Sequence, residues 1–590
     1  MAKSLYARHG GQQPRIDHAR PRADPRILLA TVIGLAPRVV CGSSSICRLV
    51  MVSARPSAAR ENRVSIYDHV LAHIPEDGPG LLPGGTRLPD EAEPDPSEVT
   101  VTFAPGLIDE ILEQGTAMAN QQAAAASFRL IQDVVRHPVA TGPHEALMED
   151  LCGKKNLGFL DPLLSQVYHA GFGRQEIRDL ALGLATRSSD RTPVKVGIVL
   201  LGLCATIEDR DILLSLGRHE EFTHYVGVAL TNAFEDAEPL LWELAKVVES
   251  WGRINLVRQL ASTRSPEIKA WILREGSRGF PAGMELAYIA ATAGELAAAL
   301  SAQEIDDVVY MAAGRILMHL IAARPFERQK DIDDYADGPE AIRRYLAHAA
   351  QKQATLEVFA PLALIVDYLE LRDGEELDVR WTKDWPSRRP LPKGWTENER
   401  ERSATYARWI LQRSEWRELI DDGLRSEDGW SFHLAERAAR WLGDDTFPVI
   451  VDRIRQSPAD DTGWYEVTSR TQDIVRWNEV LQVAFERLSR HDTPETLRWP
   501  DWMLAITQEM QRFPGTGWPL LRAALEGPLV IERRFGLRGL SWFLEDGWRW
   551  PPDADDLLDL MARSDPDQHT RGWATDLLEH SQSAGRITTP

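Results

Sequence analysis

The chain has 590 residues, a formal net charge of −21 at pH 7 and four cysteines. A single compact core stops growing at about 300 residues, so this length predicts either several domains or a repeat architecture whose core extends along one axis. The acidic balance favours a cytoplasmic protein over one with a large nucleic-acid-binding surface, and the irregular spacing of the cysteines excludes a disulfide framework and paired CxxC zinc knuckles.

Residues 1–98 differ in composition from the rest of the chain. Residues 1–50 carry seven arginines, and their one apolar run, residues 27–36, is too short to span a bilayer and lacks a signal-cleavage pattern. Residues 51–98 are rich in proline and glycine, which indicates mostly loop. We therefore predict a disordered or mis-called extension over residues 1–98, with Met51 as the natural start and no membrane partner. A targeting segment is the alternative.

Helical patterns begin shortly after this extension. Val99–Phe103 alternates like a single strand, and apolar residues recur with helical spacing from Leu107 onward. An alanine-rich stretch predicts a helix through Phe128 that stops at His137–Pro138, because the residue before a proline disfavours the helical conformation. We assign residues 99–371 to an N-terminal helical-repeat domain.

Residues 193–276 repeat one short design, namely a capped start, two or three turns of apolar stripe, and a break. The stripe predicts one helix over Pro239–Trp251, a second over Ile254–Ala261 and a third from Ser265 to Gly276. Short amphipathic helices bury such stripes only against their neighbours. The pattern therefore predicts an all-α fold, an irregular α-solenoid of stacked helices.

The same helix start recurs at three places in the chain. Each pairs a hydroxyl side chain with a following proline: Thr192–Pro193, Ser265–Pro266 and Thr493–Pro494. The hydroxyl group can accept a hydrogen bond from the first turn, and proline fits the first helical position, where its missing N–H costs no intrahelical bond. We therefore predict a helix N-terminus at each pair.

The helical pattern lapses over residues 372–398, a charged and proline-rich passage that predicts a linker or inserted loop. Residues 399–580 form the predicted C-terminal helical-repeat domain, and residues 581–590 form a tail. Sixteen of the nineteen tryptophans lie between Trp381 and Trp573. We interpret them as large side chains that fill the gaps between short helices, with a ligand-binding aromatic face as the alternative.

Three segments of the C-terminal half resemble HEAT-like (ARM-type) repeats. Ala435–Asp445, continuing to Ile454, follows the helix, turn, helix pattern of that family, and Val530–Leu540 and Thr570–Leu578 are similar to further, degenerate copies. The resemblance implies right-handed stacking of HEAT-like helical hairpins and a concave groove that binds another macromolecule. The leading hypothesis is therefore a scaffold or interaction protein, and the acidic charge favours a basic protein partner.

A second resemblance implies an enzyme. The segments Leu216–Phe222 and Trp251–Ile254 are similar to a bacterial family labelled limonene hydroxylase, which implies a small terpenoid substrate. Asp331–Asp337 contains Asp-Asp-x-x-Asp, the pattern by which class I terpene synthases hold magnesium and a diphosphate. Asp333, Asp334 and Asp337 are therefore the candidate catalytic residues. An acidic loop that caps the helix predicted to begin at Glu340 is the competing interpretation.

Glu221 and His224 are weak metal-ligand candidates. Their spacing matches the carboxylate and imidazole pair of di-iron bundles, but no second Glu-x-x-His occurs, so structural roles are the alternative. His219 and His224 lie five residues apart, which places them about 140° apart around a helix and does not fit a zincin.

The chain shows no haem-thiolate, dinucleotide or phosphate-loop motif, so we expect no cofactor. Arg253, Arg258 and Arg264 are predicted to lie near one another along two helices. That cluster keeps a HEAT-like DNA-repair protein as a minor alternative, although the overall charge disfavours a nucleic-acid partner.

Overall fold

The computed structural model describes residues 63–91, 116–154, 156–323, 330–371, 392–456, 461–489, 501–545 and 550–583, together with two pairs of short strands. The fold of these residues is all-α, as the sequence predicted. The strands are two residues long: β1 (Ser53–Ala54) pairs antiparallel with β2 (Pro94–Asp95), and β3 (Glu376–Leu377) with β4 (Ser387–Arg388). None of the helices in the described ranges combines the length and the apolar character that a bilayer crossing requires.

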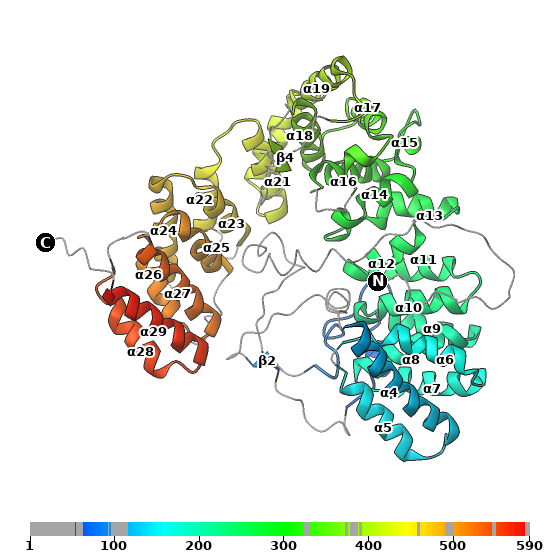
Figure 1. Cartoon of the computed structure of the whole chain (residues 1–590). Helices are drawn as coiled ribbons and strands as arrows, with labels where there is room; N and C mark the ends of the chain where they lie inside the picture. Colours follow the sequence, from blue (N-terminus) through cyan, green and yellow to red (C-terminus); the bar gives the residue numbers. More distant parts are fainter. Residues whose placement is uncertain are drawn as a thin grey trace.

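One set of helices forms a continuous row, in which each member contacts the next member although other helices separate them in the sequence. In Figure 1 the chain forms an arc, and this row lies on its inner side, most clearly from α10 to α27. We call it the inner row. It consists of α8 (Arg191–Cys204), α10 (Glu220–Ala233), α12 (Ser250–Leu260), α14 (Ala282–Ala293), α16 (Asp307–Ala322), α18 (Leu356–Glu370), α21 (Gly429–Trp441), α23 (Asp461–Arg470), α25 (Asp501–Glu509), α27 (Val530–Glu545) and α29 (Gln568–Ser583).

The remaining helices cover the other side of the arc or its N-terminal end. The outer row consists of α7 (Arg174–Arg187), α9 (Arg210–Gly217), α11 (Glu238–Val247), α13 (Pro266–Trp271), α15 (Leu296–Ala299), α17 (Gly338–Ala349), α19 (Glu397–Leu411), α20 (Glu415–Leu424), α22 (Phe447–Gln456), α24 (Ile474–Ser489), α26 (Trp518–Leu525) and α28 (Ala554–Ser564). The N-terminal end holds α2 (Ile66–Ala72), α4 (Ala117–Arg136), α5 (Thr141–Cys152) and α6 (Leu160–Ala170). Single helical turns are η2 (Ile207–Asp209), the π-helical η3 (Ile272–Gly276), η4 (Ile332–Asp334) and η5 (Met510–Arg512).

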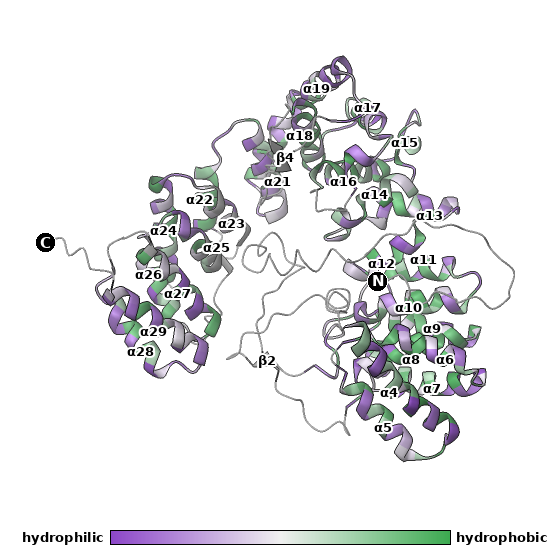
Figure 2. Ribbon diagram, in the orientation of Figure 1, coloured by the Kyte–Doolittle hydropathy of each residue, from purple (hydrophilic) through white to green (hydrophobic). Residues whose placement is uncertain are grey.

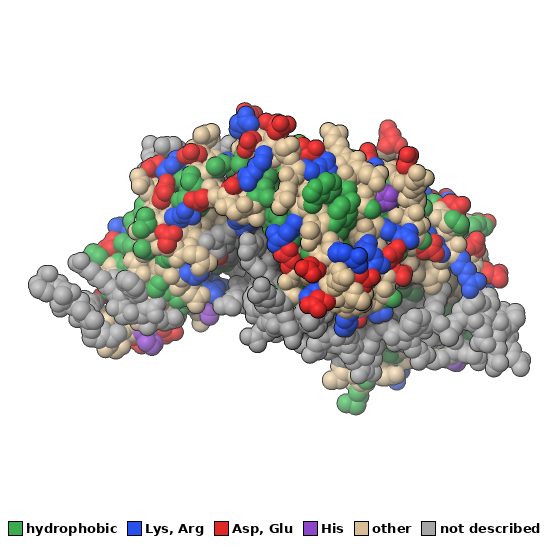
Figure 3. Space-filling model, turned by 90° about the horizontal axis from the view of Figure 1, so that it is seen from above, with side chains coloured by type: hydrophobic (Ala, Val, Ile, Leu, Met, Phe, Trp, Pro, Cys, Tyr) green, Lys and Arg blue, Asp and Glu red, His purple; other side chains and the backbone are tan. Residues whose placement is uncertain are grey.

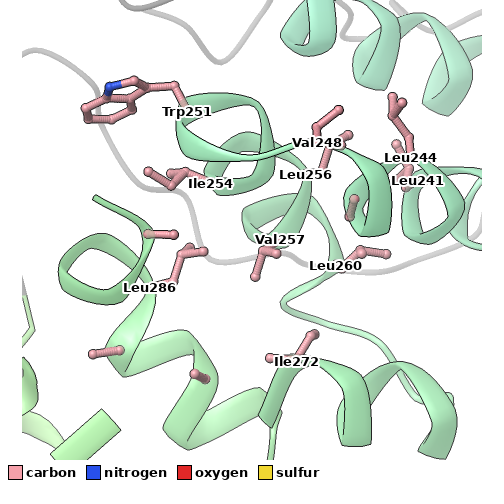
Figure 4. Close-up of a cluster of buried hydrophobic side chains, with 14 of the residues drawn as sticks. Leu241, Leu244, Val248, Trp251, Ile254, Leu256, Val257, Leu260, Ile272 and Leu286 are labelled. Carbon is pink, nitrogen blue, oxygen red and sulfur yellow. The ribbon is translucent and has the colours of Figure 1, made fainter. Parts of the chain in front are cut away.

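Apolar side chains from the two rows form the core. Coloured by hydropathy, most helices show one hydrophobic and one hydrophilic side (Figure 2), and Figure 4 shows the packing where α11, α12, η3 and α14 meet around Ile254, Val257 and Leu286. One buried cluster extends from Ile66 to Ala439, and a second extends from Phe432 to Leu577, so both include residues of α21. Most of residues 372–398 lies outside the described residues, and the domain boundary proposed there stays a prediction.

The repeat segment contains the predicted helices with one difference. The first helix, α11, ends at Val247 and not at Trp251, which belongs to the next helix, α12. Val248 is extended and buried, and Ser250 has a φ of +50°, so the backbone breaks between the two helices even though the apolar spacing continues. Hydrophobic periodicity alone could not detect this break. The third helix, α13 with η3, ends at Gly276 as predicted.

The predicted helix starts are partly correct. Ser265 caps α13, because its hydroxyl oxygen accepts a hydrogen bond from the N–H of Ile268 at 3.3 Å. The start at Thr192 is wrong, since α8 begins at Arg191 and its N-cap residue, Asp190, makes no side-chain cap. Thr493–Pro494, Val99–Phe103 and the pattern that begins at Leu107 lie outside the described residues. The helix predicted to stop at His137 is α4, which ends at Arg136.

The prediction of an unstructured extension over residues 1–98 is wrong for residues 63–91, which we call the strap. The strap contains α2, buries Ile66, Val70 and Leu88, and crosses the connections that precede α8, α10 and α12. Three hydrogen bonds hold its backbone. The N–H groups of Ile66 and Gly80 donate to the carbonyl oxygens of Ser188 (2.9 Å) and Val247 (2.8 Å), and Arg218 Nη2 donates to the carbonyl oxygen of Gly78 (2.8 Å). Proline and glycine make this strap non-helical over much of its length, but tertiary contacts fix it in place.

The described tryptophans support the packing interpretation. Trp416, Trp464 and Trp477 are among the largest fully buried side chains of the described residues. Trp416 of α20 packs edge-on against Phe359 of α18, and Arg487 of α24 lies over the ring of Trp464 of α23. Trp409 on α19 and Trp430 on α21 are exceptions, because both are exposed.

Candidate functional site

The acidic segment Asp331–Asp337 forms η4 and the turn that leads into α17, so the predicted loop before a helix is correct. Three of its four carboxylates, those of Asp331, Asp333 and Asp334, accept hydrogen bonds within the fold. Asp333 Oδ1 accepts hydrogen bonds from the Tyr368 hydroxyl (2.7 Å) and the Lys393 N–H (3.0 Å). Asp334 Oδ2 accepts from the N–H of Asp331 (3.2 Å).

Asp337 is the N-cap residue of α17, but its side chain makes no hydrogen bond to the first turn. It can interact favourably with the helix dipole without a specific bond. Within the described ranges, no three His, Cys, Asp or Glu side chains are grouped so that they could hold a metal ion. The geometry therefore gives Asp333 a structural contact and leaves the catalytic role of the segment a prediction.

Glu221 lies at the centre of a buried charged group between α8 and α10. Its Oε1 atom is 2.5 Å from Lys195 Nζ and 3.5 Å from Arg191 Nη1. Lys195 and Glu221 are 1% and 8% exposed, so this ion pair is shielded from solvent. The carboxylate neutralises two cations and is not free to act as a metal ligand beside His224, whose ring packs edge-on against Tyr225.

The strap completes this charged group. Asp90 forms a two-point contact with Arg191, with Oδ2 2.9 Å from Nε and Oδ1 3.0 Å from Nη2. His219 is buried, its Nδ1 atom accepts a hydrogen bond from the Glu221 N–H (3.2 Å), and its Nε2 atom lies 3.3 Å from the Thr86 carbonyl oxygen. These contacts require a neutral ring with its proton on Nε2. Burial lowers the pKa of His219 to about 4, so the ring keeps this form at neutral pH.

Glu220 occupies a different environment from its neighbour Glu221. Burial and the nearby charge of Glu249 raise the pKa of Glu220 to about 8, while contacts with Ser250 and Arg253 oppose that rise. A carboxyl group that is largely protonated at neutral pH can donate as well as accept a hydrogen bond. Two adjacent glutamates at the start of α10 thus have opposite roles, one as a buried anion and one as a largely neutral acid.

Buried glutamates recur farther along the inner row. Glu436 of α21 accepts a hydrogen bond from the Thr446 hydroxyl (2.7 Å) and lies 3.5 Å from Arg440 Nε. Glu466 of α23 has its Oε1 atom 3.5 Å from Nδ1 of His433 on α21. Both carboxylates are almost completely shielded from solvent. Glu466 therefore connects α23 to α21, and Glu436 connects α21 to the turn that precedes α22.

The three arginines that raised a nucleic-acid alternative do not share a surface. Arg253 is buried and donates to backbone carbonyl oxygens, Arg258 pairs with Glu285 at 2.7 Å, and Arg264 is exposed beyond the end of α12. The sequence did not identify Lys195, Arg191 and Glu220 as interior groups. A single lysine within the apolar run of α8 was the available signal, because a buried lysine requires a partner.

No protein-family model matches this chain. A search of curated protein sequences likewise finds no match. The fold and the interior charged groups are thus the features from which a function can be inferred.

Proposed function

We propose that this chain is a HEAT-like α-solenoid that acts as a cytoplasmic scaffold and binds another protein along its inner row of helices. The continuous contacts of the inner row, from α8 to α29, carry the proposal. Stacked helical pairs generate an extended curved surface, and such surfaces serve mainly for binding. The curvature in Figure 1 gives this surface a concave side.

Trp430 is the most prominent exposed aromatic side chain on the inner row. It lies in the first turn of α21, is 61% exposed, and its ring stacks on that of His433 with the centroids 5.8 Å apart. Large aromatic side chains that remain exposed in the free protein are frequent anchors of protein interfaces. We therefore place Trp430 in the surface that contacts the partner.

The charge of the chain favours a partner with a basic surface. The net charge is −21, and the face shown in Figure 3 intersperses basic and acidic side chains over its described part without one large basic region. Complementary charge accelerates association and disfavours partners of like charge.

A capture experiment with matched tryptophan variants tests this proposal. The full-length tagged chain is recovered from its native lysate, and co-purifying proteins are quantified by mass spectrometry. We expect a stoichiometric basic protein whose recovery falls at least about tenfold for Trp430→Ala, the loss typical of an anchor residue. Trp409→Ala is the control, because Trp409 is 54% exposed but lies on outer-row helix α19. Equal losses for both variants, or a retained apolar molecule without a protein, would contradict the proposal.

A further inference from the structure

A buried arginine, Arg253, and a half-buried one, Arg315, each donate to a backbone carbonyl oxygen within residues 274–278. Arg253 of α12 is 9% exposed, and its Nε and Nη1 atoms donate to the carbonyl oxygens of Val248 (2.9 Å) and Arg278 (3.4 Å). Arg315 of α16 donates from Nη2 to the carbonyl oxygen of Arg274 (3.3 Å). Guanidinium groups from two different inner-row helices therefore contact η3 and the residues that follow it.

These arginines differ from the other interior cations in their lack of a close carboxylate. Lys195 has Glu221 at 2.5 Å, and Arg533 has Asp565 at 2.6 Å. Within the part of the chain that the structure describes, neither Arg253 nor Arg315 has a carboxylate oxygen within 4.0 Å, and the buried Nε of Arg315 has no hydrogen-bond partner. A shielded cation without a carboxylate in direct contact is costly, and a bound anion would relieve that cost.

The neighbouring side chains carry charges of both signs. Arg278 carries a third guanidinium beside the pair, and its own partner is Glu275, at 3.3 Å. Burial is the main cause that lowers the pKa of both Arg253 and Arg315, and the positive charge of Arg278 adds to it. The Glu275 carboxylate opposes this lowering at both residues, and Glu249 and Glu220 oppose it at Arg253. His319, one turn after Arg315, has its pKa lowered to about 4 by burial and by Arg315, so it is neutral and can offer an N–H.

We propose that Arg253 and Arg315 form a binding site for a phosphate-type oxyanion beside residues 274–278. The planar fork of a guanidinium group matches the geometry of phosphate oxygens, and two forks from different helices would fix the orientation of the ion. In a chain with 88 acidic residues, two cations that no described carboxylate contacts within 4.0 Å, although Glu275 lies near both, indicate room for an anionic ligand between them. This site does not depend on the proposed protein partner.

Titration of the full chain with inorganic phosphate, followed by calorimetry, tests the site. We expect saturable binding that weakens at least about tenfold in Arg315→Gln and remains unchanged in Arg258→Gln. Arg258 lies on the same helix as Arg253 but is paired with Glu285, which makes it the matched control. Absence of binding to the wild-type chain, or equal weakening in both variants, would overturn the proposal.

Two further measurements keep the test decisive. Arg315→Lys retains the charge but loses the planar fork, so phosphate binding should weaken in this variant too. It provides the test if Arg315→Gln folds poorly. Unchanged binding to Arg315→Lys would refute recognition by the fork. O-phosphoserine is titrated in parallel with inorganic phosphate. Binding of both supports a site for phosphoryl groups, binding of phosphate alone supports a site for the free ion, and binding of neither contradicts both.

Discussion

Lys195 of α8 and Glu221 of α10 form an ion pair, with Nζ 2.5 Å from Oε1, in the interior of the inner row. Removing one member of a buried pair leaves the other charge in a medium that solvates it poorly. We expect Glu221→Gln to lower the free energy of unfolding by about 3–5 kcal/mol, and the double variant Lys195→Met/Glu221→Gln to recover part of that loss. Urea denaturation of the two variants measures both effects.

The exposed pair Lys269–Glu295 is the control for this prediction. Its atoms are also close, at 2.6 Å, but its side chains remain 27% and 55% exposed. Solvent screens such a pair, so Lys269→Met should change the free energy of unfolding by less than about 1 kcal/mol. Similar losses at the two sites would mean that burial does not determine the strength of the Lys195–Glu221 contact.

Substitution by alanine should change the stability of the protein in opposite directions at two glycines of the α7–α8 pair. A Cβ atom at Gly197 of α8 would lie 2.6 Å from the backbone nitrogen of Ala185 and 2.7 Å from the carbonyl oxygen of Ala181, both on α7. Backbone atoms cannot move aside locally, so Gly197→Ala should separate the helices and cost about 1–3 kcal/mol of stability.

Gly183 of α7 offers the matched substitution, because no atom lies within 4 Å of its added Cβ. Alanine has the higher helix propensity, so Gly183→Ala should stabilise the protein by about 0.5–1 kcal/mol. Thermal unfolding of the two variants is the measurement. Destabilisation by both would show that helix propensity is not the governing factor at Gly183.

The helices could be predicted from the sequence because each amphipathic stripe is a local pattern. Pro239–Trp251 shows the limit of this reasoning: the apolar spacing continues through Val248, while the chain breaks at that residue and starts α12 in a new direction. The partners of the interior charges were beyond prediction for a different reason. Lys195 meets Glu221 across 26 positions and Arg191 meets Asp90 across 101, and no local pattern encodes such distances.

The raised pKa of Glu220 predicts an unusual dependence of stability on pH. The group titrates at about 8 in the folded protein and near 4.5 when unfolded, so between these values the folded state holds a proton that the unfolded state has released. Stability from Glu220 is therefore present at low pH and is lost as the pH rises through about 8. Because the side chain is only partly buried, we expect a loss of about 2 kcal/mol.

Glu220→Gln fixes the neutral form and should remove this dependence, which leaves the variant more stable than the wild type above about pH 8. The comparison is made between the two proteins at each pH. His219 and His319 titrate at about 4 when folded and therefore lower the stability of both proteins as the pH falls below 6.5. If the free energies of unfolding of the two proteins follow parallel curves from about pH 5 to about pH 9, a raised pKa at Glu220 is contradicted.

Asp333 and Asp337 distinguish a structural role for the acidic segment from a diphosphate site. Asp333 accepts hydrogen bonds from the Tyr368 hydroxyl and the Lys393 N–H, whereas the Asp337 side chain makes no cap to α17. If the segment is structural, Asp333→Ala should cost about 1–3 kcal/mol and Asp337→Ala less than about 1 kcal/mol. The cost of Asp333→Ala should shrink in a Tyr368→Phe background, because the hydroxyl donor is then absent. Carboxylates gathered to bind metal and diphosphate would repel one another in the free protein, so an increase in stability for both alanine variants would instead favour a diphosphate site.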